Sequence, residues 1–236
     1  MISEFRLSII IPTLNEKTNI KNRLDFFQSY GSLDHIEIIV VDGNSTDGTQ
    51  DVVRNYPFAR LINSPVAARP NQMNMGATNA QYEWLYFLHA DVQIPSSFFQ
   101  DIYQASSTHL IGGYRYQFDS NHLLLKVNAF FTRFPMMWCR GGDQTLFIKR
   151  SFFEELSGFD EYFEVMEDFD IIKRAKKSTD YCIIPKNVIV SSRKYHHNGY
   201  WKVQRVNLKA FRMFRNGVDP KEIRIFYKKA LGLKDY

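Results

Sequence analysis

Short apolar runs alternate with amphipathic stretches along the first half of the chain. β-branched and aromatic residues that run together predict strands, and apolar residues that recur every three or four positions predict helices. The predicted strands are residues 7–12, 36–41, 58–62 and 84–88, and the predicted helices are residues 16–30, 49–56 and 71–80. This alternation predicts a doubly wound α/β sheet, with its site at the carboxyl ends of the strands.

The second half alternates less regularly. The pattern predicts strands at residues 113–118, 143–149, 182–185 and 188–191, and helices at residues 95–107, 151–157, 168–177 and 201–215. Residues 123–138 are strongly apolar but are interrupted by Lys126, Arg133 and Pro135, so we expect them to be buried beneath a loop. Since no repeat, low-complexity tract or Gly/Ser linker divides the chain, residues 1–236 predict a single domain.

Composition narrows the class of protein. A chain of 236 residues with 44% hydrophobic and 15% aromatic residues is neither disordered nor fibrous. No apolar run approaches the roughly 18–20 residues that span a bilayer, and the first residues lack the features of a signal peptide. Cys139 and Cys182 each stand without a CxxC neighbour, which disfavours a zinc framework and suits a reduced, cytoplasmic protein.

Charge is unevenly distributed along the chain. Residues 1–172 contain 13 basic and 21 acidic residues, whereas residues 173–236 contain 17 basic and 4 acidic residues. The basic end indicates either solvated helix faces or a surface for anionic partners. Although the pI is near 9.1, no nucleic-acid motif accompanies this charge, so a nucleic-acid partner is not expected.

Polar residues follow three of the predicted strands, where they would share one crevice. These residues are Thr13, Asn15 and Glu16 after the first strand, Asp42 after the second, and His89 and Asp91 after the fourth. Residues 42–48 have the composition of a tight turn with a helix N-cap, and Asp42 is expected to be functional as well. Neither GxGxxG nor GxxxxGK[ST] occurs, which disfavours dinucleotide binding and P-loop hydrolysis.

Six segments carry a resemblance to a known family. They are SIIIPTLNE at 8–16, EIIVVDGNSTDGT at 37–49, ARPNQMNMGATNA at 68–80, WLYFLHAD at 84–91, GGDQTLFIKRSFFEELSGFD at 141–160 and VMEDFD at 165–170. Together they resemble family 2 glycosyltransferases with the GT-A fold, and in particular a small soluble bacterial subgroup with His-Ala-Asp in place of Asp-x-Asp.

The resemblance implies a GT-A type α/β fold, a Rossmann-like mixed sheet flanked by helices. It implies a nucleotide-sugar-binding half at about residues 1–91 and an acceptor and catalytic half at about residues 92–200, followed by basic C-terminal helices at 201–236.

The resemblance also implies roles on the donor side. Thr13, Glu16 and Asp42 match positions that hold the nucleobase and ribose. Arg69 matches a basic position near the ribose and diphosphate; the alternative is that it pairs with a nearby carboxylate such as Asp47.

A divalent metal, Mn²⁺ or Mg²⁺, is implied by the segment that ends the fourth strand. Asp91 matches the position that contacts the metal, where a cation would stabilise the departing diphosphate. His89 departs from the family pattern, so it could instead contact phosphate or pack in the core. His197, in the pair His196-His197, matches a histidine on the metal or diphosphate; the alternatives are a surface loop, or contacts to the diphosphate from Arg193 and Lys194.

Asp168 aligns with the catalytic base of the family, and Glu167 precedes it. An inverting transfer needs a carboxylate that removes the proton of the acceptor hydroxyl. The alternative is that both acids charge the first turn of a helix. On the acceptor side, Asp143 and Gln144 would contact hydroxyl groups, and Trp201 is either an acceptor platform or part of the core.

The sequence thus predicts an inverting glycosyltransferase that moves one sugar from a nucleotide diphosphate sugar, UDP first and GDP second, to an undetermined acceptor. The acceptor could be a lipid-linked glycan, a metabolite or a protein. One alternative is a sugar-nucleotide-binding module with weak or no catalysis. A sugar-1-phosphate nucleotidyltransferase ranks lower, because the first loop lacks a glycine-rich, basic phosphate loop.

A peripheral contact with the inner face of a membrane is a further hypothesis. Residues 123–138 could combine with basic residues of the last predicted helix, at an anionic lipid surface. These basic residues are Lys202, Arg205, Lys209, Arg212 and Arg215.

Overall fold

The computed structural model of the chain describes residues 4–139 and 145–232. The strands are β1 (Leu7–Thr13), β2 (Ile36–Asp42), β3 (Ala59–Asn63), β4 (Trp84–Phe87), β5 (Ile111–Phe118), β6 (Leu146–Lys149) and β7 (Cys182–Val190). The helices are α1 (Lys17–Ser29), α2 (Thr49–Arg54), α3 (Arg69–Asn79), α4 (Phe98–Ser106), α5 (Leu123–Phe131), α6 (Arg150–Glu155), α7 (Glu167–Ala175), α8 (Arg193–Asn198), α9 (Tyr200–Arg215) and α10 (Pro220–Leu231), with a short 3₁₀ turn, η2, at Met137–Cys139.

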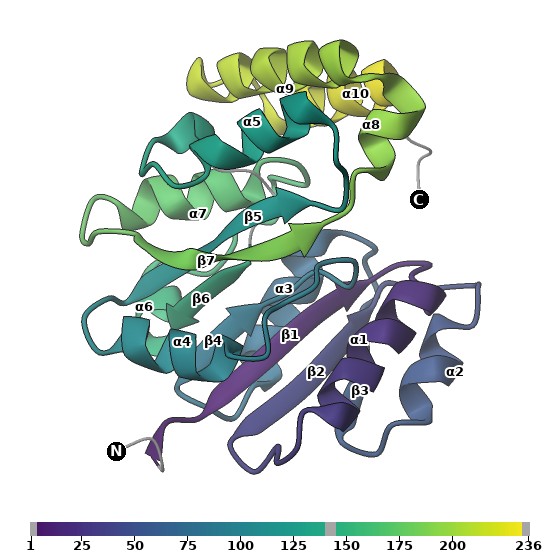
Figure 1. Cartoon of the computed structure of the whole chain (residues 1–236), viewed down its shortest axis with the longest axis vertical. Coiled ribbons are helices and arrows are strands. Elements are labelled where there is room, and N and C mark those ends of the chain that lie inside the picture. Colours follow the sequence, from purple (N-terminus) through teal and green to yellow (C-terminus); the bar gives the residue numbers. More distant parts are fainter. Residues whose placement is uncertain (1–3, 140–144, 233–236) are drawn as a thin grey trace.

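The seven strands form one mixed sheet in the order β3-β2-β1-β4-β6-β5-β7. β1 pairs in parallel with β2 and β4, and β2 pairs in parallel with β3. β6 runs antiparallel to both β4 and β5. Helices cover both faces of the sheet (Figure 1). The predicted mixed, helix-flanked α/β sheet is confirmed.

β1 is buried along its whole length because it lies between two parallel neighbours and beneath helices on both faces. Its alternate side chains enter two cores. Leu7 and Ile9 pack in a cluster with residues of α1, α4 and α9, whereas Ile10 packs in a second cluster with residues of α3, α6 and α7. The continuous apolar runs seen in the sequence are therefore the central strands of the sheet.

β7 differs from the sequence prediction, which expected two short strands. The structure has one strand, because its pairing with β5 skips two residues: Tyr114 pairs with Ile184, and Arg115 pairs with Asn187. This irregularity passes over Pro185, which has no N–H to contribute to the ladder. Pro185, which the sequence pattern places at the end of a strand, is here contained within a bulge.

α5 also corrects a prediction. The apolar stretch that begins at residue 123 was expected to be buried beneath a loop. It starts as a helix instead, and of its nine residues only Leu125 is fully buried. α5 lies with α9 and α10 at one end of the molecule, at the top of Figure 1. Within the described residues, no helix has the length and apolarity needed to cross a membrane.

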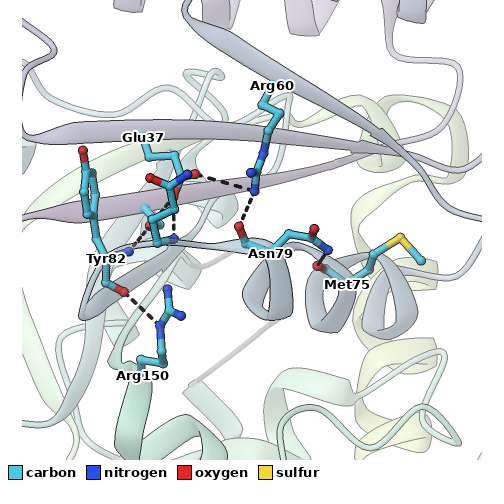
Figure 2. Close-up of polar contacts among 8 residues, drawn as sticks. Glu37, Arg60, Met75, Asn79, Tyr82 and Arg150 are labelled. Atoms are coloured by element: carbon cyan, nitrogen blue, oxygen red, sulfur yellow. Dashed lines mark hydrogen bonds and ion pairs between the residues drawn. The ribbon is translucent and has the colours of Figure 1, made fainter.

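A polar network ties together the amino ends of the parallel strands, opposite the edge where the polar loops lie. Glu37 of β2 accepts hydrogen bonds from the Ser8 hydroxyl at 2.7 Å and from the backbone N–H of Gln81 at 2.9 Å. Arg60 of β3 pairs with Glu37 at 3.6 Å and donates to the carbonyl of Asn79 at the end of α3 (Figure 2). This network holds one edge of the sheet, which leaves the opposite edge for the site.

Candidate functional site

The loops that follow β1 and β2 are joined by hydrogen bonds. The N–H of Gly43 donates to the carbonyl of Thr13 at 2.9 Å, and the N–H of Asn15 donates to the hydroxyl of Ser45 at 2.8 Å. In return, the side-chain oxygen of Asn15 accepts from the N–H of Thr46 at 2.9 Å. Asn15 adopts a left-handed conformation with a φ of 54°, which asparagine tolerates better than most residues. The two loops therefore form one preorganised edge.

Asp42 lies at the centre of this edge and is completely buried. Its carboxylate accepts hydrogen bonds from the Thr13 hydroxyl at 3.0 Å, the Gln50 amide at 2.7 Å, and both the N–H and the hydroxyl of Ser45 at 2.8 and 2.5 Å. A nucleobase N–H could reach this carboxylate only if one of these donors moved. The structure thus gives Asp42 a structural role, and its contact with a nucleobase stays a prediction.

Gln72 joins the same edge to α3, one of the helices that cover the sheet. Its buried amide donates to the carbonyls of Thr13 and Val41, both at 2.8 Å. The loop beside it is tightly packed, since a Cβ added at Gly43 would lie 3.1 Å from the Cα of Ala67. Sequence reasoning assigned no role to Gln72. The available signal was a polar side chain on the apolar face of a helix, next to Met73.

Asp91 and Arg193 meet where the segments after β4 and β7 come together, and their charges act on Glu16 in the segment after β1. Arg193 of α8 lies 3.4 Å from the carboxylate of Asp91. Burial raises the pKa of Glu16 above its ordinary value, the hydrogen bond from Asn19 lowers it in part, and the negative charge of Asp91 raises it further. The structure therefore brings together two of the predicted donor-side carboxylates and one of the predicted alternative cations.

Arg23 of α1 is a buried cation close to this group. Burial lowers its pKa to about 10, while the negative charge of Asp91 acts in the opposite direction. Sequence reasoning missed Arg23, although it occupies the same helix face as Ile20 and Leu24, where a charged residue is unusual.

Glu167 and Asp168 begin α7 and are both buried. Arg69, at the first turn of α3, lies 3.3 Å from the carboxylate of Glu167. Met166, which precedes the pair, has a φ of 74°, a left-handed conformation that a long side chain rarely adopts. An uncommon backbone turn thus presents the two acids side by side.

The pairing of Arg69 corrects one detail of the sequence prediction. The alternative for Arg69 was an ion pair with a nearby carboxylate, for which Asp47 was the example. Asp47 instead accepts hydrogen bonds from the Thr49 hydroxyl at 2.6 Å, at the start of α2, and from the N–H of Lys17 at 3.0 Å, at the start of α1. The partner of Arg69 is Glu167, which lies 98 positions further along the chain.

The segment that leads into α7 is fixed to α3. The side-chain amide of Asn74 exchanges two hydrogen bonds with the backbone of Phe159, at 2.8 and 2.9 Å. Arg174 of α7 donates to Asp170 at 2.7 Å and to the carbonyl of Gly158 at 2.9 Å. These bonds hold the first turns of α3 and α7 in place, and with them Arg69 and Glu167.

The predicted metal ligands Asp91, His89 and His197 do not form a three-residue site. Across residues 4–139 and 145–232, no three His, Cys, Asp or Glu side chains are grouped so that they could hold a metal ion. His89 is half-buried after β4, whereas His197 is exposed on α8. His196, beside it, is 3.0 Å from the Ser192 hydroxyl.

Asp91 still fits a cation in one way. Mg²⁺ is commonly held by one or two carboxylates together with the phosphates of a substrate, and it favours oxygen ligands. The half-exposed carboxylate of Asp91 supplies such an oxygen at the end of β4. A metal at this position would depend on a phosphorylated ligand for the rest of its coordination.

On the acceptor side, the structure tests only one of the three predicted residues. Asp143 and Gln144 lie outside the described residues. Trp201 is exposed at the start of α9, and its ring packs edge-on against Tyr200 with centroids 5.2 Å apart. The alternative that Trp201 belongs to the core is therefore wrong, and its role as an acceptor platform stays a prediction.

Comparison with known sequences identifies a family and a curated relative. The model of the family described as "Glycosyl transferase family 2" matches residues 8–155. A GalNAc(5)-diNAcBac-PP-undecaprenol beta-1,3-glucosyltransferase of Campylobacter jejuni is 30% identical over 108 residues. That match covers 43% of this chain and 35% of the relative, so the chain aligns with about a third of the relative's length.

Two solved structures show the same fold. A mannosyltransferase from Pyrobaculum calidifontis, in complex with GDP-Man and Mn²⁺, has a TM-score of 0.67 at 21% identity over 97% of this chain and 68% of its own. TarS residues 1–349 from S. aureus, in complex with UDP-GlcNAc, has a TM-score of 0.64 at 14% identity over 96% of this chain and 72% of its own. The GT-A type of the fold is thereby confirmed.

Proposed function

The chain belongs to glycosyl transferase family 2, and we propose that it transfers one sugar from a nucleotide diphosphate sugar to an acceptor, with inversion at the anomeric carbon. One observation carries this proposal: Arg193 lies 3.4 Å from Asp91, so the segments after β4 and β7 converge at the carboxyl edge of the sheet, where the charge of Asp91 also acts on Glu16 after β1. A site with this mixture of acidic and basic groups suits a diphosphate and its accompanying cation.

The donor is proposed to be a UDP-sugar, with a GDP-sugar as the second choice. The two similar structures contain UDP-GlcNAc and GDP-Man, which supports a nucleotide sugar as the class of donor. Thr13, Glu16 and Asp42 border the edge where the nucleoside would lie. Because the Asp42 carboxylate is buried, Glu16 and the backbone of the adjoining loops are the groups that a nucleoside could reach first.

Asp91 is proposed to hold a divalent metal when the donor is bound, and Mn²⁺ accompanies the donor in the mannosyltransferase structure. Such a metal would stabilise the negative charge that gathers on the departing diphosphate. Arg193, 3.4 Å from Asp91, lies where it could contact the same diphosphate.

Asp168 is proposed as the general base. Its carboxylate would take the proton from the acceptor hydroxyl while that oxygen attacks the anomeric carbon, and the bond from that carbon to the diphosphate oxygen would break. Glu167 is engaged by Arg69, which gives it a positioning role beside Asp168. Both acids also charge the first turn of α7, so the catalytic and helix-stabilising interpretations are compatible.

The acceptor is proposed to be lipid-linked, since the curated relative is named for an acceptor attached to undecaprenol diphosphate. A sugar-nucleotide-binding module with weak catalysis is the second candidate. The observation that favours it is His89 in the place of an acidic residue.

Nucleotide binding gives the test of the donor site. Thermal unfolding would be followed with UDP, GDP, ADP and CDP, each with and without Mn²⁺. We expect UDP or GDP to raise the unfolding temperature, more so with Mn²⁺, and we expect Asp91→Asn to remove the Mn²⁺-dependent part. The exposed residue Asp180, changed to asparagine, is the control. A chain that none of these nucleotides stabilises would contradict the proposed donor site.

A further inference from the structure

α5 and the turn that follows it present a stripe of exposed apolar side chains. Leu123, Val127 and Phe130 are 72%, 46% and 46% exposed. Their spacing of four and three residues places them on one side of the helix, and Phe134, in the turn that follows the helix, is also exposed. Arg133 lies over the ring of Phe130 at 3.7 Å from its centroid, so a cation borders the stripe. Exposed apolar side chains of this size and spacing indicate a contact surface.

α9 presents a stripe of exposed cations. Its exposed basic residues are Lys202, Arg205, Lys209, Arg212 and Arg215. Trp201 and Leu208, which are 64% and 50% exposed, lie among them. The helix contains no acidic residue. α9 therefore combines a high positive charge with large apolar side chains on its outer side, the composition of a helix at a membrane surface.

The two helices are attached to each other. The hydroxyl of Tyr195 accepts hydrogen bonds from Asn128 of α5 at 3.4 Å and from Gln204 of α9 at 3.3 Å. Leu125 of α5 and Val203 of α9 pack in the same core cluster beside β5 and β7. Both helices therefore bury one side in the same cluster, and they lie together at one end of the molecule (Figure 1).

We infer that these exposed residues of α5 and α9, here called the α5–α9 surface, bind the surface of an anionic lipid bilayer. Cations of α9 would lie at the lipid phosphates while Leu123, Val127 and Trp201 enter the boundary between headgroups and acyl chains. Two other partners fit less well. Phe130 and Trp201 could stack on nucleic-acid bases, but the exposed aliphatic side chains Leu123, Val127 and Leu208 could not. A second copy in a symmetric dimer would place one α9 stripe near another stripe of the same charge.

The α5–α9 surface has a defined relation to the site. α8, which carries Arg193, is separated from α9 only by Gly199. If α9 lay on a membrane, Arg193 of the site would therefore be joined to the membrane-bound helix by only a short segment of chain. The inference concerns lipid binding alone and does not require the proposed transfer reaction, so nucleotide binding and vesicle binding can fail independently.

Vesicle sedimentation tests the inference with matched variants. The full chain would be mixed with phosphatidylcholine vesicles, with or without 30% phosphatidylglycerol. Arg205→Gln/Arg212→Gln removes two cations of the surface, and Lys21→Gln/Arg54→Gln removes two exposed cations from α1 and α2. Unfolding temperatures would show that all variants remain folded.

A second pair of variants tests the apolar part. Leu123→Ser/Val127→Ser changes the stripe on α5, and Leu110→Ser changes an exposed leucine outside the surface.

We expect the chain to sediment with anionic vesicles at low salt and to dissociate from them at high salt. It should not sediment with neutral vesicles. Each cation near such a surface contributes roughly fivefold to partitioning, so the Arg205/Arg212 variant should bind about thirtyfold more weakly, and the Lys21/Arg54 variant should bind normally. The Leu123/Val127 variant should bind about tenfold more weakly, and the Leu110 variant should be unaffected.

Three results would overturn the inference. One is the absence of sedimentation with anionic vesicles at low salt. Another is equal binding by the two charge variants, which would show that total charge and not the α5–α9 surface controls binding. The third is a wild-type dimer in light scattering that becomes a monomer in the Leu123/Val127 variant, while neither protein binds vesicles. This result would identify a second copy as the partner.

Discussion

Gln72 connects the carboxyl ends of β1 and β2 to α3, and its replacement tests how the site edge is held. Its buried amide donates to two backbone carbonyls, those of Thr13 and Val41, both at 2.8 Å. Gln72→Met preserves the approximate length of the side chain but removes both donors. Gln72→Glu preserves the shape and replaces the amide by a carboxyl group, which places oxygens against the two carbonyls.

The expected loss of stability in the Gln72→Met variant follows from the two lost hydrogen bonds. Each contributes about 1 kcal/mol to the free energy of unfolding. The carbonyl of Thr13 keeps its bond from Gly43, which limits the penalty for an unsatisfied acceptor. We therefore expect Gln72→Met to cost about 2 kcal/mol. At pH 7, Gln72→Glu should cost about 3–5 kcal/mol, because an ionised carboxylate would be buried against carbonyl oxygens.

The two variants also differ in their dependence on pH. Burial would raise the pKa of the introduced glutamate above its unfolded value, so the protonated form would be favoured in the folded state. The stability of the Gln72→Glu variant relative to the wild type should then fall as pH rises through the folded pKa and recover at lower pH. The Gln72→Met variant has no such group and should show a constant difference.

Urea unfolding monitored by circular dichroism at pH 5 and pH 8 measures both effects. Gln204→Met is the control, since the Gln204 amide donates one long hydrogen bond of 3.3 Å to Tyr195; its cost should be below about 1 kcal/mol. If Gln72→Met is within about 0.5 kcal/mol of the wild type, the two carbonyl contacts do not stabilise the edge. A Gln72→Glu variant that matches Gln72→Met at pH 8 would refute the same reasoning.

Three further variants test other contacts by urea unfolding. Arg69→Gln should cost about 1 kcal/mol, because Arg69 is half-exposed while Glu167 is buried, and adding Glu167→Gln should recover part of that loss; a strictly additive double variant would exclude coupling. Tyr162→Phe should destabilise the protein at pH 7 but less at pH 3. The Tyr162 hydroxyl lowers the pKa of Asp219, and the stabilising effect of this contact is lost as pH falls through that pKa. An equal cost at both pH values would contradict this. Gly76→Ala gains about 1 kcal/mol of helix propensity. Its added methyl group would overlap a buried isoleucine of β1, which should cost about 1–3 kcal/mol of stability. A variant more stable than the wild type would contradict the packing described.

Much of the fold was predictable from the sequence, because local signals and tertiary packing agree in the first half. β1 and β2 are continuous apolar runs that lie in the parallel part of the sheet, where both faces are buried. α3 has a helical spacing that faces the same core. The predictions failed where local signals were overruled by neighbours: Pro185 is accommodated by a bulge against β5, and α5 is helical and exposed despite its apolarity.

The candidate site was only partly predictable, for a related reason. The residues that follow the strands are visible in a sequence, since parallel strands end at one edge. Their contacts are not, because Arg69 with Glu167 and Asp91 with Arg193 are about a hundred positions apart. The burial of Asp42 was equally hidden, as it depends on donors from three separate segments.

The most direct test of the central claim measures transfer and donor binding in the same Asp168 variant. Release of UDP or GDP from a panel of nucleotide sugars would be followed for the wild type, Asp168→Asn and the control Asp180→Asn, with an undecaprenyl diphosphate-linked glycan as acceptor. We expect Asp168→Asn to lower the rate by about 10²–10⁴-fold while the nucleotide still raises its unfolding temperature, because a general base contributes to the chemical step. An Asp168→Asn variant with wild-type rates, or a wild-type chain that binds nucleotide but transfers no sugar from any donor in the panel, would contradict the proposed mechanism.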